Sequence, residues 1–287
     1  MSRSAAVEVL RAGALTTVQD QGRPGWAHLG VPRSGALDPA ALRLANRLVG
    51  NPEPAAGLEV TLGGCVLRFT AATTVAVTGA DTELWVDDRP ADVGRPLSVP
   101  AGAVLRIGPP RAGLRSWLAV AGGIAVEPVL GSRSADTLSG LGPPPIRDGD
   151  RLALGPPAGD PAPVDVTVGW APPAEIRLRV RLGPRDDWFT PAAVHRLLHT
   201  PYTVGPLSNR VGVRLEGPAL PRAVPGELPS EGLVLGAVQV PADGRPLVFL
   251  ADHPTTGGYP VIGVVADVTP LAQARPGTTV RFHGPER

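Results

Sequence analysis

A turn crowded with hydrogen-bonding groups lies near the C-terminal end of the chain. Residues 251–260 read Ala-Asp-His-Pro-Thr-Thr-Gly-Gly-Tyr-Pro, between a strand-like run at 247–251 and a second strand that begins near Val261. Paired glycines let backbone N–H groups approach a ligand closely, while an acid, two hydroxyls and a phenol add acceptors and donors. Two interpretations follow: a glycine-rich hairpin capped by its acid, or a binding turn formed by Asp252, Thr255, Thr256, Gly257, Gly258 and Tyr259.

Two other polar segments lie in glycine-rich turns. Ser208-Asn209-Arg210 offers a hydroxyl, an amide and a guanidinium in sequence, and arginine binds a carboxylate or a phosphate bidentately. The alternative is that Arg210 pairs with a structural acid. Glu231, between Ser230 and Gly232, is either a carboxylate base or a solvated loop acid.

The residue types present argue against several kinds of catalysis. All 27 basic residues are arginines, which excludes a Schiff-base lysine and the lysine of a P-loop. The single cysteine, Cys65, cannot form an internal disulfide. His195 and His199 have helical i, i+4 spacing, but the intervening residues hold no glutamate and no third ligand is evident, so we expect surface histidines and no bound metal. The sequence contains neither a Gly-x-Ser-x-Gly elbow nor a readable nucleotide motif.

Composition limits the class of protein further. The chain has 287 residues, 43% of them hydrophobic, and a formal net charge of +1. This length and apolar content predict a globular protein with about two domains, and the charge gives no reason to expect a nucleic-acid or membrane partner. No apolar run reaches membrane-spanning length and residues 1–10 lack the apolar core of a signal peptide, so we expect a cytoplasmic protein.

Short strands dominate the predicted secondary structure, and two helices stand out. Residues 175–182 alternate apolar side chains with arginines, which is typical of a half-buried strand. Asp38 followed by Pro39 predicts the start of a helix that ends at Gly50, and Thr190 with Pro191 starts a second helix reaching about His199. A short helical turn is expected after Pro270. Further strands are expected at 58–62, 73–78, 104–107, 116–120, 234–239 and 247–251.

A weak internal repeat and a composition change suggest the domain boundaries. Residues 100–107 resemble residues 276–282, and the segment between the two copies at 155–173 is dense in proline, alanine and glycine. We read this segment as a linker. The predicted organisation is an N-terminal β domain at 1–155, a linker at 156–173 and a C-terminal β-barrel domain at 174–287, because barrels remove exposed sheet edges.

Several sequence blocks resemble one known family. The Asp252–Pro260 turn is similar to the D-x-Q-T-T-G-G-Y-P element of the allophanate hydrolase subunit 2 family, which includes the C subunit of 5-oxoprolinase, the Kip-type antagonist and part of the carboxyltransferase region of urea carboxylase. Pro254 and Val261 depart from it, standing where glutamine and a basic residue are usual, so contacts of those two side chains do not carry over. Further matching blocks lie at 17–25, 30–38, 45–51, 208–212, 215–218, 230–232 and 239–241.

The resemblance implies a fold, an activity and partners. It implies two cyclophilin-like β-barrel domains with few short helices. It also implies the C subunit of a bacterial ATP-dependent 5-oxoprolinase, inactive alone. The implied partners are an allophanate hydrolase subunit 1-type protein (the B subunit of 5-oxoprolinase) and the 5-oxoprolinase A subunit, with ATP at or with one of these partners. Opening a lactam needs an activated carbonyl and stabilisation of negative charge.

Site roles are expected on that basis. Asp252 and Glu231 are the candidates for proton transfer. A small amide or lactam substrate is expected to bind at Ser208, Asn209, Arg210, Gln239, Thr255, Thr256, Gly257, Gly258 and Tyr259, with Arg210 on the substrate carboxylate.

Two other functions stay open. The first is a carboxyltransferase module that moves a carboxyl group from carboxybiotin to a urea-like amide, for which another chain must carry biotin because this one lacks lysine. The second is a non-enzymatic regulator that binds its subunit 1-type partner.

Overall fold

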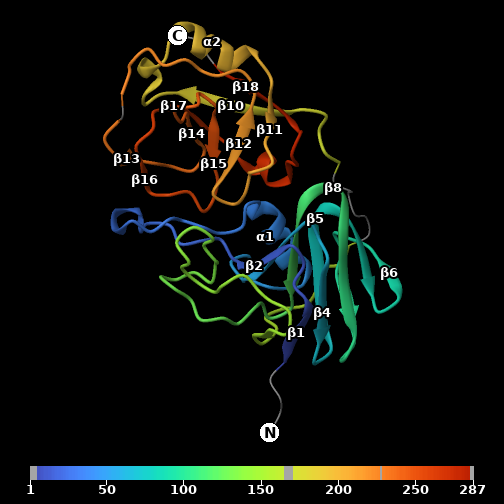
Figure 1. The fold of residues 1–287 in the computed structure, drawn as a ribbon. Helices are drawn as coiled ribbons and strands as arrows, with labels where there is room; N and C mark the ends of the chain where they lie inside the picture. Colours follow the sequence, from blue (N-terminus) through green and yellow to red (C-terminus); the bar gives the residue numbers. More distant parts are fainter. Residues whose placement is uncertain (1–4, 165–170, 227, 285–287) are drawn as a thin grey trace. The chain divides into compact units, whose positions relative to one another are not determined.

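The chain forms two compact units, each built mainly from β-strands (Figure 1). The computed structural model describes residues 5–164, 171–226 and 228–284. Unit 1 comprises Met1–Arg23 and Ser34–Pro172, and unit 2 comprises Pro24–Arg33 and Pro173–Arg287. The short segment Pro24–Arg33 therefore leaves the N-terminal half of the sequence to join the second unit, which the sequence-based boundaries did not anticipate.

The structure describes part of the predicted linker at 156–173. Within it, the Ala162 N–H donates to the Leu48 carbonyl at 3.0 Å, and just before it the Gly155 N–H donates to the Gly123 carbonyl at 3.1 Å. A Cβ on Gly50 would lie 2.5 Å from the Asp160 carbonyl oxygen, so this packing is close. Residues 165–170 of the predicted linker lie outside the described residues.

The described residues of unit 1 form a nine-stranded half-barrel sheet. Its main path runs β2-β3-β8-β4-β1-β9, with β5 pairing β6, β7 and β8. Strands β5 and β8 form a long antiparallel pair, and the register of this pairing shifts between Gly79 and Leu84 of β5. The strands are β1 Ala6–Arg11, β2 Leu15–Gln19, β3 Gly57–Thr61, β4 Cys65–Phe69, β5 Thr73–Val86, β6 Arg89–Ala91, β7 Leu97–Val99, β8 Val104–Val120 and β9 Arg151–Ala153.

Helix α1, Pro39–Leu48, begins where the sequence predicts. The Asp38 carboxylate accepts a hydrogen bond from the Ala41 N–H at 2.9 Å, which satisfies one of the free donors at a helix start. The apolar face of α1 buries Ala45 and Leu48 against Ala76 of β5 and Ala119 of β8. The small side chains on both sides let the helix lie close to the sheet.

A buried polar network holds the N-terminal motif of unit 1. Asp20 is 7% exposed and accepts four hydrogen bonds, from the Gly22 and Arg133 N–H groups and the Ser132 and Ser134 hydroxyls, at 2.6 to 2.8 Å. Arg23, 1% exposed, donates to the Ser134 carbonyl and to the hydroxyl of Ser34. This network joins the chain around residue 20 to the loop around residue 133.

Unit 2 is a closed barrel among its described strands, in the order β10-β17-β14-β15-β12-β11-β18. The alternation predicted for residues 175–182 is confirmed in β10, where Ile176, Leu178 and Val180 are buried. Its strands are β10 Ile176–Leu182, β11 Tyr202–Val204, β12 Gly212–Glu216, β13 Glu231–Gly232, β14 Ala237–Gln239, β15 Leu247–Phe249, β16 Thr256–Gly257, β17 Val261–Val265 and β18 Thr279–His283. Its helical elements are η1 Ala27–Leu29, η2 Asp186–Trp188, α2 Pro191–His199 and η3 Thr269–Gln273.

The mainly-β prediction and both predicted helices are confirmed. Thr190 caps α2 by accepting from the Ala193 N–H at 3.1 Å, and η3 occupies the helical turn expected after Pro270. The rings of His195 and His199 are stacked, with their centroids 4.0 Å apart. Within the described ranges, no helix has the length and apolar character needed to cross a bilayer.

The Asp20 network yields a stability prediction. Asp20→Ala leaves several buried donors without an acceptor, and each such group costs about 1–3 kcal/mol, so we expect the free energy of unfolding to fall by about 3 kcal/mol or more. Urea unfolding of the full chain measures this. The matched control is Asp92→Ala, whose carboxylate is 70% exposed beside Arg95 and whose loss should cost within about 0.5 kcal/mol. Equal stability of the two variants would contradict the assignment.

Candidate functional site

The glycine-rich turn pairs with the Glu231 segment to form a small two-stranded ribbon. Strand β16, Thr256–Gly257, lies antiparallel to β13, Glu231–Gly232, with Glu231 opposite Gly257 and Gly232 opposite Thr256. The Leu233 N–H extends the ribbon by donating to the Thr255 carbonyl at 2.8 Å. Two of the segments that the sequence marked as functional therefore lie side by side.

The first residue of the turn is held by a buried ion pair. Arg210 binds Asp252 through both carboxylate oxygens, Nε to Oδ2 at 2.9 Å and Nη2 to Oδ1 at 3.0 Å. The two side chains are 1% and 0% exposed, and the Asp252 N–H also donates to the Arg210 carbonyl at 3.1 Å. Since a buried charge is tolerated only when it is paired and hydrogen-bonded, each of these residues keeps the other in place.

This pairing changes the roles expected for both residues. The guanidinium of Arg210 holds the Asp252 carboxylate, the structural acid of the alternative interpretation, in place of a substrate carboxylate. Asp252 has no exposed surface from which to exchange a proton with a ligand. We therefore assign both residues to positioning the turn.

Ser208 and Asn209 also bind backbone groups. The Ser208 hydroxyl donates to the Gly205 carbonyl at 2.8 Å and accepts from the Arg214 N–H at 3.1 Å. The Asn209 side-chain oxygen accepts from the Val211 N–H at 2.8 Å. These bonds shape the loop that leads into β12, as Ser and Asn side chains commonly do in turns.

Glu231 forms a second arginine pair, with Arg185. The Arg185 Nε donates to Glu231 Oε2 at 3.0 Å, and Nη2 donates to Oε1. The two side chains are 37% and 31% exposed, so water screens the pair. Hydrogen bonding from Arg185 lowers the pKa of Glu231 below its ordinary value, and the same bond raises the pKa of Arg185. An acid held in its charged form is a weak base, which argues against Glu231 as the proton acceptor.

Gln239 fixes the far end of the turn. Its side chain is 5% exposed, and its Nε2 donates to the Tyr259 carbonyl at 3.1 Å. A Cβ on Gly257 would lie 2.8 Å from that same Nε2, whereas a Cβ on Gly258 would meet only the Leu228 carbonyl, at 3.2 Å, among described atoms. Neither glycine has a left-handed φ. Gly257 is therefore required by close packing, and Gly258 has one tight neighbour, the Leu228 carbonyl oxygen.

The accessible part of the turn borders a hollow on unit 2. Thr256 and Tyr259 are exposed, and Thr255, Gly257 and Gly258 are half-buried. Tyr259 lines an open hollow of about 540 Å³, where the Arg222 guanidinium carbon lies 5.9 Å from the centroid of its ring. The segment Pro24–Arg33 reaches the same turn, since a Cβ on Gly30 would lie 3.9 Å from the Thr255 hydroxyl. The hollow's lining residues are Ala219, Leu220, Pro221, Arg222, Gly226, Pro241, Ala242, Asp243, Gly244 and Tyr259.

Sequence reasoning missed two arginines of the site, Arg185 and Arg222. Arg185 lies 46 residues from its partner Glu231, and Arg222 lies in a proline-rich loop with no recognisable motif.

The structure also shows what surrounds Val261 and Pro254, the two residues that depart from the family pattern. Val261 is buried among Leu233, Ala237 and Phe249, and the Pro254 carbonyl oxygen lies 2.7 Å from Nδ1 of the neighbouring histidine.

The buried ion pair predicts a large loss of stability when one partner is neutralised. Asp252→Asn removes the charged, bidentate partner of Arg210 in the interior, so we expect the free energy of unfolding to fall by about 3–5 kcal/mol. Chemical unfolding of the full chain measures it. The control is Asp187→Asn, an exposed acid of η2, which should change stability by less than about 0.5 kcal/mol. A fully stable Asp252→Asn variant would show that the pair does not hold the turn.

The Arg185–Glu231 pair predicts a pH dependence. Because the pKa of Glu231 is lowered in the folded protein, its stabilising effect is complete above the ordinary glutamate pKa and is lost as the pH falls through the lowered value. Arg185→Gln should raise the pKa of Glu231, measured by NMR titration of the side-chain carboxyl carbon. Arg179→Gln on β10 is the matched control and should leave the titration unchanged. An unaltered Glu231 titration in Arg185→Gln would refute the pairing.

Comparison with known proteins places this arrangement in a family. The family model "Carboxyltransferase domain, subdomain A and B" matches residues 29–284. The chain is 41% identical to the C subunit of 5-oxoprolinase from Escherichia coli (strain K12) over 96% of this chain and 90% of that protein. It is 34% identical to urea amidolyase of Lachancea kluyveri over 96% of this chain but only 17% of that protein.

A solved structure agrees with these matches. The crystal structure of Kluyveromyces lactis urea carboxylase superposes on 98% of this chain with a TM-score of 0.89 and 32% identity, and the chain spans 28% of that longer protein. The matches cover both units, and the fold, the turn and its supporting residues all lie within them. The chain therefore belongs to the carboxyltransferase domain family, subdomains A and B.

Proposed function

We propose that this chain is the C subunit of a 5-oxoprolinase that opens the 5-oxoproline lactam to glutamate with ATP hydrolysis and a subunit 1-type partner. The observation that carries the proposal is the match in length and identity. The C subunit of the E. coli 5-oxoprolinase is covered over 90% of its length at 41% identity, whereas only 17% of the urea amidolyase of L. kluyveri is covered. The chain thus matches most of the length of the first protein and one region of the second.

The exposed face of the turn is suited to the lactam carbonyl. As the lactam opens, negative charge grows on the carbonyl oxygen, and preformed hydrogen-bond donors stabilise it. The Thr255 and Thr256 hydroxyls and the backbone beside Gly258 are the groups we assign to this oxygen. Arg222, which lies beside Tyr259 in the hollow, replaces Arg210 in our assignment as the cation for the substrate carboxylate.

The proton-transfer group is assigned to a partner. Asp252 is buried against Arg210, and Glu231 is held ionised by Arg185. With both carboxylates occupied, the described residues of this turn hold no further acid, and we expect the isolated chain to be inactive. Its role is to bind and orient the substrate and to complete the site with the subunit 1-type protein and the A subunit.

ATP is also assigned to one of the partners. A P-loop needs a lysine and a glycine-rich loop that opens a helix. This chain has no lysine, and its Thr255–Gly258 turn leads into strand β17. We therefore derive no step through ATP on this chain.

A carboxyltransferase role is the second candidate, because the fold matches that of a urea carboxylase structure. In that case the same turn binds a urea-like amide, and a separate chain brings carboxybiotin. A regulator that binds its partner without turnover is the third. The three differ in the measurement that follows.

The test is ATP-dependent release of glutamate from 5-oxoproline by the chain co-expressed with its subunit 1-type and A-type partners. We expect turnover by the assembly and none by the chain alone. Biotin-dependent carboxylation of urea without glutamate release would favour the second candidate, and an assembly without either activity would favour the third. Turnover by the isolated chain would contradict the partner requirement.

Substitutions in the turn test the site. Gly258→Ala should keep the fold, since φ is not left-handed and a shift of a few tenths of an ångström relieves its one tight contact, with the Leu228 carbonyl at 3.2 Å. It should lower turnover by the assembly at least about tenfold, equivalent to about 1.4 kcal/mol. Thr255→Val, which removes only the hydroxyl, should do the same. Gly232→Ala on the facing strand is the control, because a Cβ there meets no described atom within 4 Å. Wild-type turnover in both turn variants would show that the turn is structural.

A further inference from the structure

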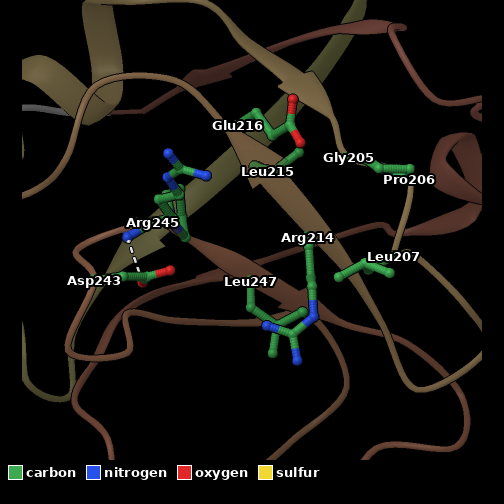
Figure 2. Close-up of a pocket in the computed structure, with 10 residues that line it drawn as sticks. Gly205, Pro206, Leu207, Arg214, Leu215, Glu216, Asp243, Arg245 and Leu247 are labelled. Atoms are coloured by element: carbon green, nitrogen blue, oxygen red, sulfur yellow. Dashed lines mark hydrogen bonds between the residues drawn. The ribbon is translucent and has the colours of Figure 1, made fainter.

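A second hollow on unit 2 is lined by charges of both signs. It lies over strand β12, has a volume of about 170 Å³ and is bordered by the loop at 205–207 and the turn at 243–247. In Figure 2, Glu216 lies at one end and Arg214 at the other, with Arg245 and Asp243 along one side and the Gly205–Leu207 loop along the opposite side. The proposed lactam chemistry assigns no role to these four charged residues, although Asp243 also borders the hollow beside Tyr259.

Backbone hydrogen bonds fix both walls of the hollow to β12. The Gly205 N–H donates to the Arg214 carbonyl at 2.7 Å, and the Leu215 N–H donates to the Pro246 carbonyl at 2.9 Å. The 243–245 turn is closed by the Asp243 carboxylate, which accepts from the Arg245 N–H at 3.0 Å. The hollow is therefore a formed feature of the barrel, with walls that keep their spacing.

The four charged side chains are available to a ligand. Arg214, Glu216, Asp243 and Arg245 form no ion pair with any residue in the described part of the chain. Arg214 and Glu216 are two residues apart on β12, both on its exposed face. Their charges sum to zero, two positive and two negative, so a pure anion or a pure cation meets repulsion as well as attraction.

The remaining lining is apolar and the space is small. Pro206, Leu207, Pro246 and Leu247 provide the apolar surface, and Leu207 is 74% exposed at the rim. At about 30 Å³ for each water in the liquid, 170 Å³ corresponds to only about five or six waters. The hollow fits a small molecule with two opposite charges and a short aliphatic part.

We propose that this hollow binds the zwitterion of a small apolar α-amino acid. Arginine guanidinium groups bind carboxylates through directed N–H bonds, which assigns the ligand carboxylate to Arg245, whose guanidinium lies nearer to Glu216 than that of Arg214 does in Figure 2. The ligand ammonium lies at Glu216, because one oxygen of Asp243 already closes its own turn. The aliphatic side chain packs against Leu207 and Leu247. The proposal is independent of the lactam reaction, since it rests on binding alone.

The experiment is NMR titration of the full chain with L-valine, followed at the backbone amides of Gly205, Leu215 and Arg245. We expect saturable shifts, and binding about tenfold weaker for isovalerate, which lacks the ammonium, and for isobutylamine, which lacks the carboxylate. Arg245→Gln and Glu216→Gln should each weaken L-valine binding about tenfold. Arg179→Gln, an exposed arginine of β10, is the matched control and should leave it unchanged.

The outcomes separate clearly. Equal binding of isovalerate and L-valine would reveal a plain anion site, and equal binding of isobutylamine a plain cation site; either overturns the proposal. No saturable shift at L-valine concentrations on the order of 10 mM, or undiminished binding by both hollow variants, would show a solvated charged surface and overturn it as well.

Discussion

The buried ion pair between Arg210 and Asp252 is the constraint on which the rest of unit 2 depends. Arg210 precedes β12 and Asp252 follows β15, two strands that pair antiparallel with Gly212 opposite Phe249. The pair therefore lies at one shared end of these strands and fixes where the turn after β15 begins. Removing two charges from water is costly, and the bidentate geometry offsets that cost only while both partners stay in place. Strand β16, which pairs with β13, lies in the turn that begins at Asp252.

Much of the fold could be predicted from local sequence. The Asp38-Pro39 and Thr190-Pro191 helix starts and the alternation in β10 are short-range signals, and each was found where expected. The long strands β5 and β8 were predicted only as fragments, because Gly79, Pro109, Pro110 and Gly113 interrupt their patterns. Register shifts in their pairing let both strands continue through these residues, and such shifts depend on the partner strand rather than on local propensity.

The site was predictable in its location but not in its electrostatics. The sequence marked Arg210, Glu231 and Asp252 as reactive groups, yet it could not show that two of them pair with each other or that Arg185 pairs with the third. These partners lie 42 and 46 residues apart in the chain, and only the closed barrel brings them together. Ser208, Asn209 and Gln239, chosen for their polar chemistry, instead bind backbone groups of the loops that carry the site.

The central claim is that Arg210 and Asp252 act on each other to position the turn, and family membership does not decide this. A double-mutant cycle with Arg210→Met, Asp252→Leu and the double variant, measured by chemical unfolding of the full chain, tests it most directly. The account predicts that the double variant is far less destabilised than the sum of the singles, because either single variant already breaks the bidentate pair, with a coupling energy of about 1–3 kcal/mol. Additive losses, with a coupling energy near zero, would contradict it.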